Sequence, residues 1–319
     1  MRAGCIQHGS MRIAQLNVPL HECGLAFVTL LLASSLVAGE ILEQTVFAYP
    51  QAVRLTDGVV EAVVVPAFAR VARFGKVGGA NRLFENTRAE RCLSAWYNPG
   101  GDRVWPWPQS SWKTLAGRAW PPPIGTDGPL TTSTPKLGHL RLVGMLPSHG
   151  VRMIRDFTLE NGALRCGTRF ERVEGSLITT PVAVWQIAQV PYPVRVLART
   201  ADAKTAIGLA ERWSQATADG EQLTLTLDPI RSGEAIFSAQ VLAWRGADGS
   251  GLALIRRGSG GPAKVWVGRP PKPGEDAEPA SAELELTSVE RALAPGEAVE
   301  LVTEMRLLES GDPLPAGQP

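Results

Sequence analysis

Tryptophan is concentrated in one stretch of the chain, where its spacing fits ligand binding. Five of the nine tryptophans lie between residues 96 and 120, interleaved with prolines at 99, 106 and 108. Proline fixes its own backbone and interrupts helices, so we expect rigid, irregular loops here. Indole rings stack on the apolar faces of sugars, and nearby polar side chains bind the hydroxyls. The candidate carbohydrate-binding residues are Asn86, Asp102, Arg103, Trp105, Trp107, Gln109, Trp112 and Asp127.

Other interpretations of this stretch stay open. The same indoles can plug one end of the fold as a small aromatic core, with the prolines fixing loop shape. Asp102 and Asp127 flank the cluster, and a pair of carboxylates can do acid and base chemistry on a glycosidic bond. Each is equally compatible with a structural turn, because Asp102 follows two glycines and Asp127 precedes one.

Other catalytic groups are sparse. Outside the N-terminal segment the histidines are His139, on a predicted strand, and His149, in a predicted turn. Glu297 lies in a Pro-Gly-Glu turn, where a structural role is expected. The sequence has no Gly-x-Ser-x-Gly, Walker-type, His-Glu-x-x-His or Cys-x-x-Cys motif. We therefore predict neither a metal site nor a cofactor.

The N-terminal segment has the pattern of an export signal. Residues 24–38 form an uncharged apolar run that is short for a membrane span and typical of a signal-peptide core. Val37 and Gly39 fit cleavage before Glu40, and Met11 is an alternative start. We predict a signal peptide over residues 1–39 and a periplasmic or secreted protein without stable membrane insertion. An uncleaved anchor is the alternative.

Charge and cysteine content bear on the partners and the compartment. The 32 Lys and Arg residues nearly balance the 31 Asp and Glu residues, giving a net charge of +1. Such a chain has no overall basic field to attract nucleic acid, so nucleic-acid binding is not expected.

After loss of the leader, Cys92 and Cys166 remain. They either form a disulfide or stay as two separate buried thiols.

Turn dipeptides recur between short runs rich in Val, Leu, Ile and Thr from residue 40 onward, which is typical of hairpins. Two hairpins are expected at residues 53–65 and 151–173, and the best helix candidate covers residues 203–214. With no low-complexity linker between halves, residues 40–319 are predicted to form one all-β domain. Its expected architecture is a large antiparallel sandwich with few short helices.

Charged residues on two predicted strands carry further expectations. Glu283 and Glu285 alternate with apolar residues, which indicates a strand that is buried on one face only. Arg152 and Arg155 are expected to be solvated strand residues.

Five segments match a known family in their order and spacing: residues 78–86, residues 100–109 with Trp112, residues 120–123, residues 127–129 and residues 184–190. On these residues the chain resembles the DUF4380 family, which is similar to the galactose-mutarotase-like, carbohydrate-binding β-supersandwich superfamily. The resemblance spans roughly residues 50–310 and implies one β-supersandwich domain. The superfamily includes aldose epimerases, polysaccharide lyases and accessory domains of glycoside hydrolases, so function does not follow from the fold.

The resemblance also limits the chemistry. Mutarotases of the superfamily use a histidine and a glutamate as acid and base. Their histidine segment would fall near residues 181–190, where this chain has Trp185 and no histidine, which argues against mutarotase activity. The favoured function is an extracytoplasmic carbohydrate-binding protein. The alternatives are a carbohydrate-active enzyme of the epimerase, lyase or glycosidase type, or an envelope scaffold whose tryptophan loops bind another protein.

Overall fold

The fold was determined from a computed structural model of the chain. It describes residues 40–42, 51–86, 98–122, 126–128, 130–136, 138–144, 150–176, 179–192, 195–210, 214–227, 231–268 and 280–317. The chain's contacts divide it into Met1–Ser34 and Ser35–Pro319, and every described residue belongs to the second unit. The predicted leader with its cleavage site, Cys92 and His149 lie outside the described residues.

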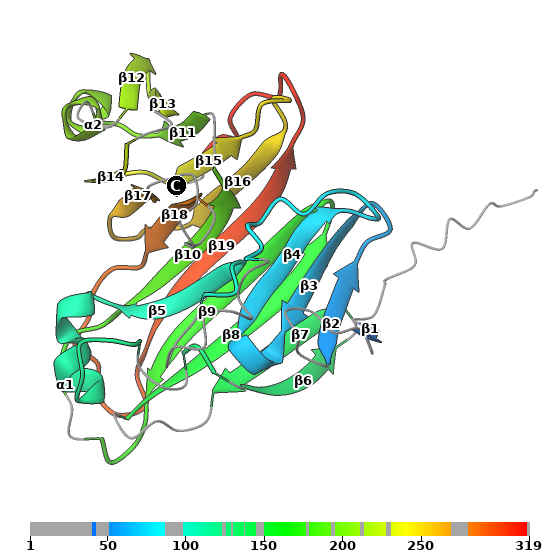
Figure 1. Cartoon of the computed structure of the whole chain (residues 1–319). Coiled ribbons are helices and arrows are strands. Elements are labelled where there is room, and N and C mark those ends of the chain that lie inside the picture. The colour runs from blue at the N-terminus through cyan, green and yellow to red at the C-terminus, as the bar shows by residue number, and fades with distance from the viewer. Residues whose placement is uncertain are drawn as a thin grey trace, which may run out of the picture. The chain divides into compact units, whose positions relative to one another are not determined.

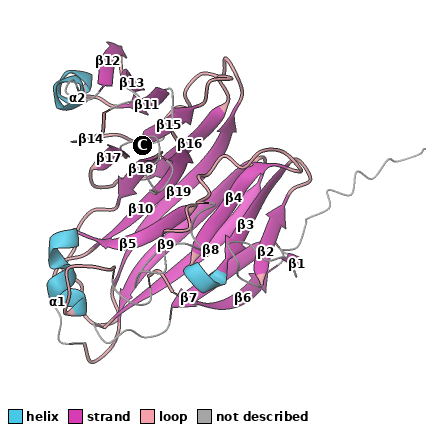
Figure 2. Ribbon diagram, viewed as in Figure 1, coloured by secondary structure: helices cyan, strands magenta, loops and turns pink. Residues whose placement is uncertain are grey.

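Strands dominate the described part of the chain, of which 56% is strand and 8% is helix (Figure 2). This confirms the all-β prediction. The short helices are η1 (Pro66–Phe68), η3 (Gln109–Ser111), α1 (Trp112–Ala116) and α2 (Ala203–Ala210). None of the helices described is both long and apolar enough to span a membrane.

The described strands form three antiparallel sheets. The four-stranded sheet has the order β1 (Glu40–Leu42), β2 (Ala52–Thr56), β3 (Val60–Val65) and β4 (Arg70–Lys76). The five-stranded sheet has the order β14 (Gly233–Phe237), β17 (Ala263–Val267), β18 (Ser281–Thr287), β10 (Ala183–Pro191) and β5 (Asp102–Trp107). The ten-stranded sheet has the order β12 (Ser214–Asp219), β13 (Gln222–Leu227), β11 (Arg195–Arg199), β15 (Val241–Arg245), β16 (Gly251–Arg257), β19 (Ala298–Leu308), β9 (Ala163–Arg172), β8 (Val151–Glu160), β7 (His139–Gly144) and β6 (Leu130–Lys136).

The three sheets share one hydrophobic core. The main cluster joins buried side chains from each of them, such as Val64, Phe157 and Leu284. Strands β2, β3 and β4 lie in front of β7, β8 and β9, while β10 and β18 of the five-stranded sheet contact β19 and β15 (Figure 1). The ten-stranded sheet is therefore covered by both smaller sheets, as expected for a sandwich.

Local turn signals predicted the hairpins well. The pairs β2/β3 and β8/β9 confirm the two hairpins expected from the sequence. The predicted helix was too long, because α2 ends at Ala210 and β12 already begins at Ser214. Pairing of β12 with β13 outweighs the weak helix propensity of this segment, which includes Gly208.

The tryptophan-rich stretch is more regular than its prolines suggested. The expectation of irregular loops was wrong for β5, which pairs with β10, and for α1. Pro106 is accommodated because β5 is an edge strand, hydrogen-bonded to a neighbouring strand of its sheet on one side only. A proline in an edge strand places its missing N–H where no ladder bond is needed.

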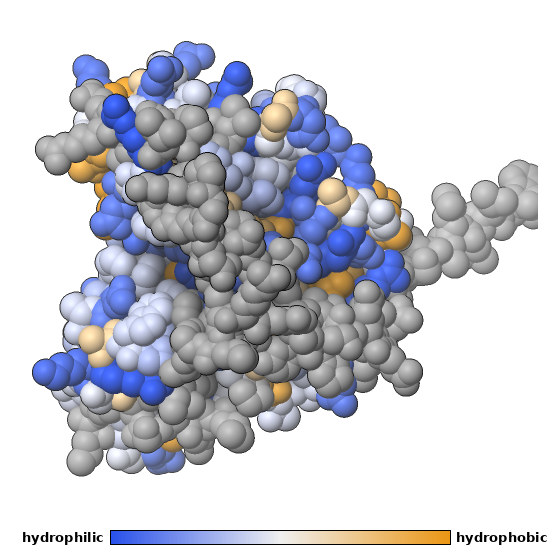
Figure 3. Space-filling model, viewed as in Figure 1, coloured by the Kyte–Doolittle hydropathy of each residue, from blue (hydrophilic) through white to orange (hydrophobic). Residues whose placement is uncertain are grey.

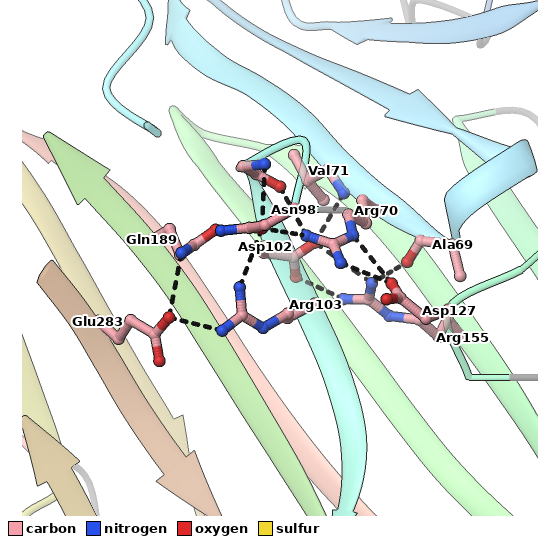
Figure 4. Close-up of polar contacts among 11 residues, drawn as sticks. Ala69, Arg70, Val71, Asn98, Asp102, Arg103, Asp127, Arg155, Gln189 and Glu283 are labelled. Carbon is pink, nitrogen blue, oxygen red and sulfur yellow. Dashed lines mark hydrogen bonds and ion pairs between the residues drawn. The ribbon is translucent and has the colours of Figure 1, made fainter. Parts of the chain in front are cut away.

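A fully buried carboxylate, that of Asp102 on β5, links the three sheets (Figure 4). Its Oδ1 accepts the Val71 N–H of β4 at 2.6 Å, and its Oδ2 accepts Arg155 Nη2 of β8 at 2.5 Å. Gln186 Nε2 of β10 donates to the same Oδ2 at 3.0 Å, and the Gln186 Oε1 accepts the Thr303 hydroxyl of β19 at 2.6 Å. One side chain thus ties the edge strands of two sheets to the third.

Arg155 is fully buried, so the expectation that it is solvated was wrong. Besides Asp102, its guanidinium binds the Ala69 carbonyl at 2.5 Å and the Thr168 hydroxyl at 3.3 Å. Burial by itself would lower the pKa of Arg155, but the Asp102 carboxylate outweighs it and raises that pKa. Arg155 therefore stays charged and holds the buried anion.

Two glycines bring Asp102 close enough to make these bonds. Gly100 and Gly101 have φ values of 92° and 76°, in the left-handed region that favours glycine. A Cβ at Gly100 would collide with the Phe84 carbonyl, and one at Gly101 with the Val71 carbonyl. The Gly-Gly-Asp order is therefore required by both backbone conformation and space.

We predict that Asp102→Asn destabilises the fold by about 3–5 kcal/mol, because it leaves the buried Arg155 charge without its counterion. The measurement is the free energy of unfolding in urea. The control is Glu171→Gln, which breaks the half-exposed Arg152–Glu171 pair and should cost less than about 1 kcal/mol. Equal small costs for the two variants would contradict a structural role for the Asp102 ion pair.

Candidate functional site

Alternate residues of four adjacent strands in the five-stranded sheet share the face turned away from the main core. Their neighbours in sequence, such as Val104, Val184 and Leu284, point into that core. The outward set, which we call the tryptophan face, is Arg103, Trp105 and Trp107 on β5, Trp185, Ile187 and Gln189 on β10, Glu283 and Glu285 on β18, and Lys264 and Trp266 on β17.

The indoles of this face pack edge to face. Trp185 meets Trp105 at 5.7 Å and Trp107 at 5.1 Å between ring centroids, with interplanar angles of 77° and 83°. Trp120, which is 48% exposed, contacts Trp105 at 5.8 Å. Trp105 and Trp185 are buried and Trp107 is half-buried, so the accessible end of the cluster is at Trp107 and Trp120.

A buried carboxyl group lies against these rings. Glu285 Oε2 accepts the Trp185 Nε1–H at 2.7 Å, and Glu285 Oε1 is 3.5 Å from Lys264 Nζ. Burial and the neighbouring Glu283 carboxylate raise the pKa of Glu285 to about 8, although Lys264 and the indole N–H oppose this. Glu285 therefore holds its proton in neutral solution, an unusual state that is common at functional sites.

The other carboxylate, Glu283, is held by two donors (Figure 4). Arg103 Nη2 donates to its Oε1 at 2.5 Å and Gln189 Nε2 donates to the same atom at 3.0 Å. The Arg103 guanidinium also lies 4.2 Å from the Trp105 ring centroid. Among the described residues, Arg103 Nε and Gln189 Oε1 have no hydrogen-bond partner despite their burial. Such atoms are rare in folded proteins, and a ligand hydroxyl can satisfy both a donor and an acceptor.

Side chains along β5 alternate between the two faces of the sheet, so the binding residues predicted on this strand fall on opposite faces. Arg103, Trp105 and Trp107 point to the tryptophan face, whereas Asp102 points into the core and forms the ion pair described above. Trp112 is fully buried against the rings of the face, with its centroid 5.5 Å from that of Trp105 and its Nε1–H donated to the Pro106 carbonyl at 2.7 Å. In this position its ring presents no surface to solvent.

The remaining predicted residues lie apart from the face. Asp127 pairs with the buried Arg70 at 2.6 Å, and Asn86 Nδ2 donates to the Asn98 carbonyl at 2.8 Å. Figure 4 shows Asp127 with Arg70 and Asn98, and the Asn98 Oδ1 accepts both Arg70 Nη1 and Arg103 Nη1 at 3.2 Å, which connects this network to the edge of the face. Gln109 is exposed in η3.

The sequence analysis did not identify Glu283, Glu285 and Lys264 as residues of the site. Glu283 and Glu285 were expected on the open side of a half-buried strand, but every residue of β18 is buried, so that expectation was wrong. The alternation of polar and apolar residues shows that the two faces of a strand differ. It does not show whether other parts of the protein cover the polar face. Trp185 lies in a segment that carried the family resemblance, which was the available signal.

Cys166 is a free thiol buried in the core, and burial raises its pKa. Within the described ranges, no three His, Cys, Asp or Glu side chains meet closely enough to hold a metal ion. Glu297 accepts the Ala294 N–H at 2.9 Å within its turn, as expected of a structural residue.

Comparison with solved structures identifies the fold. The chain matches a galactose mutarotase-like protein from Clostridium acetobutylicum with a TM-score of 0.57 and 12% identity, covering 85% of this chain and 99% of that one. A galactose mutarotase-like protein from Lactobacillus casei gives a TM-score of 0.55 at 9% identity, over 80% of this chain and 99% of that one. A galactose mutarotase related enzyme from Lactobacillus acidophilus gives 0.53 at 8% identity, over 83% and 100%.

The chain therefore has the galactose mutarotase-like β-sandwich fold, which is the fold that the resemblance implied. No family model matches the sequence. No curated protein matches it either.

We predict a pH-dependent loss of stability that Glu285→Gln removes. The pKa of Glu285 is raised from 4.5 to about 8. The contribution of its protonated carboxyl to the free energy of unfolding is therefore complete below about pH 4.5 and is lost as the pH rises through about 8. The slope is at most about 1.4 kcal/mol per pH unit. Urea unfolding across this range should show the variant gaining on the wild type as pH rises.

The matched control is Glu290→Gln, at an exposed position, which should follow the wild-type pH profile. Parallel profiles for wild type and Glu285→Gln would show that Glu285 ionises normally.

Proposed function

We propose that the protein is an extracytoplasmic carbohydrate-binding protein and that the tryptophan face is its binding site. The observation that carries this proposal is the Glu285 carboxyl, buried, bonded to the Trp185 indole and 3.5 Å from Lys264. Aromatic rings beside a few convergent polar groups are the usual composition of a sugar site. The fold neighbours support the same substrate class, since they are described as galactose mutarotase-like or related proteins.

Within this proposal the residues have different tasks. Trp107 and Trp120, the more accessible rings, stack on the sugar, and Arg103, Gln189 and Lys264 bind its hydroxyls. Gln109, exposed in the neighbouring η3, is a further candidate contact. The buried pairs and amides behind β5, namely Asp102, Asp127 and Asn86, position the strand and its loop.

The compartment and the narrower family belong to the same proposal. The apolar run at residues 24–38 supports a cleaved signal peptide over residues 1–39 and a periplasmic or secreted location. The five segments quoted above support membership in the DUF4380 family within the superfamily.

A second candidate function is a carbohydrate-active enzyme, and one observation favours it. A carboxyl that keeps its proton near neutral pH is suited to act as a general acid, and Glu285 is such a group. Mutarotation and reducing-sugar assays on the wild type and on Glu285→Gln decide between binding and turnover. The scaffold alternative has less support, because Trp105, Trp112 and Trp185 are buried and exposed hydrophobic residues form small separate groups on the surface in Figure 3.

We predict that Trp107→Ala weakens binding of a sugar identified on a glycan array by about 1–3 kcal/mol, the apolar contact of one ring, without unfolding the protein. Trp112→Ala is the matched control and should instead lower the free energy of unfolding by about 3–5 kcal/mol. Isothermal titration calorimetry and urea unfolding measure the two effects. Unchanged affinity in a folded Trp107→Ala protein would remove this ring from the site.

A further inference from the structure

The tryptophan face continues onto the edge strand β14, where it has a second accessible apolar end. In the strand register Trp266 of β17 lies opposite Glu234 of β14, and Lys264 lies opposite Ile236. Their neighbours in sequence on both strands point into the main core, so these four side chains share the tryptophan face. Ile236 is 42% exposed and Trp266 is half-buried. We call Trp266 and Ile236 the β14 end of the face.

A glycine makes room for the ring at this end. A Cβ at Gly268 would meet Cη2 of the Trp266 ring at 2.9 Å and Cζ3 at 3.2 Å, and the φ of Gly268 is outside the left-handed region. Packing against the indole, and not backbone conformation, therefore requires glycine here. The position of the Trp266 ring is thus fixed by the chain around it.

The β14 end is far from the β5 end, which consists of Trp107 and Trp120. Trp107 pairs with Ala183 of β10. Trp266 is in line, across β18, with Gln189 of the same strand, so the two tryptophans are six residues apart along the strands and three strands apart across them. At about 3.3 Å per residue and about 4.8 Å per strand, this diagonal is roughly 20–25 Å long. A single sugar can stack at one end and cannot reach both.

Polar groups lie between the two ends. Lys264 is half-buried, and its Nζ is 5.6 Å from the Trp185 ring centroid, so its side chain reaches from β17 toward the β5 end. The buried Arg103 and Gln189 each keep one polar atom, Nε and Oε1, without a hydrogen-bond partner among the described residues. An unpartnered donor and an unpartnered acceptor on one face point to a ligand that supplies both, as a hydroxyl does.

The charges of the face are balanced. The two cations that the described residues place there each pair with an acid, Arg103 with Glu283 and Lys264 with Glu234. Burial beside Glu283 raises the pKa of Glu285 to about 8, so this carboxyl adds no charge in neutral solution. The face therefore favours neither a cation nor an anion, and a neutral sugar chain fits it.

We propose that the tryptophan face binds a neutral oligosaccharide, with one sugar unit stacked on Trp107 and another, several units along the chain, stacked on Trp266. The hydroxyls of the units between them bind Lys264, Arg103 and Gln189. This inference rests on the proposed function, because it assigns the length of the carbohydrate to the same site. Trp266 is then the residue that selects for length.

The test measures affinity against chain length. A glycan array that carries monosaccharides and neutral linear cello-, manno- and galacto-oligosaccharides up to hexasaccharides selects the series, and isothermal titration calorimetry gives the affinity of each member. Affinity should rise from the monosaccharide to the pentasaccharide by at least about tenfold, because the longer chain gains the apolar contact of a second indole.

Two variants separate the ends of the face. Trp266→Ala should weaken binding of the pentasaccharide about tenfold and leave binding of the monosaccharide unchanged, whereas Trp107→Ala should weaken both. Trp266→Phe keeps an aromatic ring and should retain most of the dependence on length. Val59→Ala is the control, since it removes an exposed apolar side chain from the turn between β2 and β3, and it should bind as the wild type does.

A second readout uses the folded wild type alone. The indole N–H signal of Trp266, assigned in the NMR spectrum by its loss in Trp266→Phe, should shift with the pentasaccharide and stay in place with the monosaccharide. Three results would overturn the inference while the proposed function stands: equal affinity for the two ligands, an unchanged affinity of folded Trp266→Ala for the pentasaccharide, or a pentasaccharide that leaves the Trp266 signal in place. Absence of binding to every saccharide on the array would reject both.

Discussion

The ion pair between Asp102 and Arg155 is the constraint on which the rest of the site depends. It fixes one residue of β5 toward the core, and side chains along a strand alternate between its faces. With Asp102 held inward, Arg103, Trp105 and Trp107 must point outward, which supplies three of the ten residues of the tryptophan face. A slip of β5 by one residue would bury three functional candidates in the main core and expose a carboxylate that three sheets use.

Asp102 and Glu285 are buried carboxyl groups on opposite faces of this sheet, and their charges are compensated to different degrees. Asp102 receives a guanidinium, a backbone N–H and a side-chain amide, so its charge is fully compensated and its role is structural. Glu285 receives one indole N–H and a more distant ammonium, and its pKa rises to about 8. A buried carboxyl group whose charge is incompletely compensated lowers the stability of the fold. Proteins retain such groups mainly at functional sites.

The sequence alone predicted the structural features that depend on residues close together in the chain. The hairpins β2/β3 and β8/β9 follow from local turns, and the all-β class follows from their repetition. The buried pairs could not be predicted, because Asp102 and Arg155 are 53 residues apart and Trp185 and Glu285 are 100 apart. The same limit explains why Arg155 and Glu285 were assigned to solvent: alternation predicts two faces, whereas only the tertiary fold determines that both are covered.

The central claim is that Asp102 aligns β5 so that the tryptophan face receives a sugar, and a crystal structure of the protein soaked with a neutral sugar tests it most directly. The account predicts the sugar ring against Trp107, with hydroxyls bonded to the atoms of Arg103, Gln189 or Glu285 that the described residues leave available. A well-ordered sugar bound on another surface, with the tryptophan face unchanged, would contradict it.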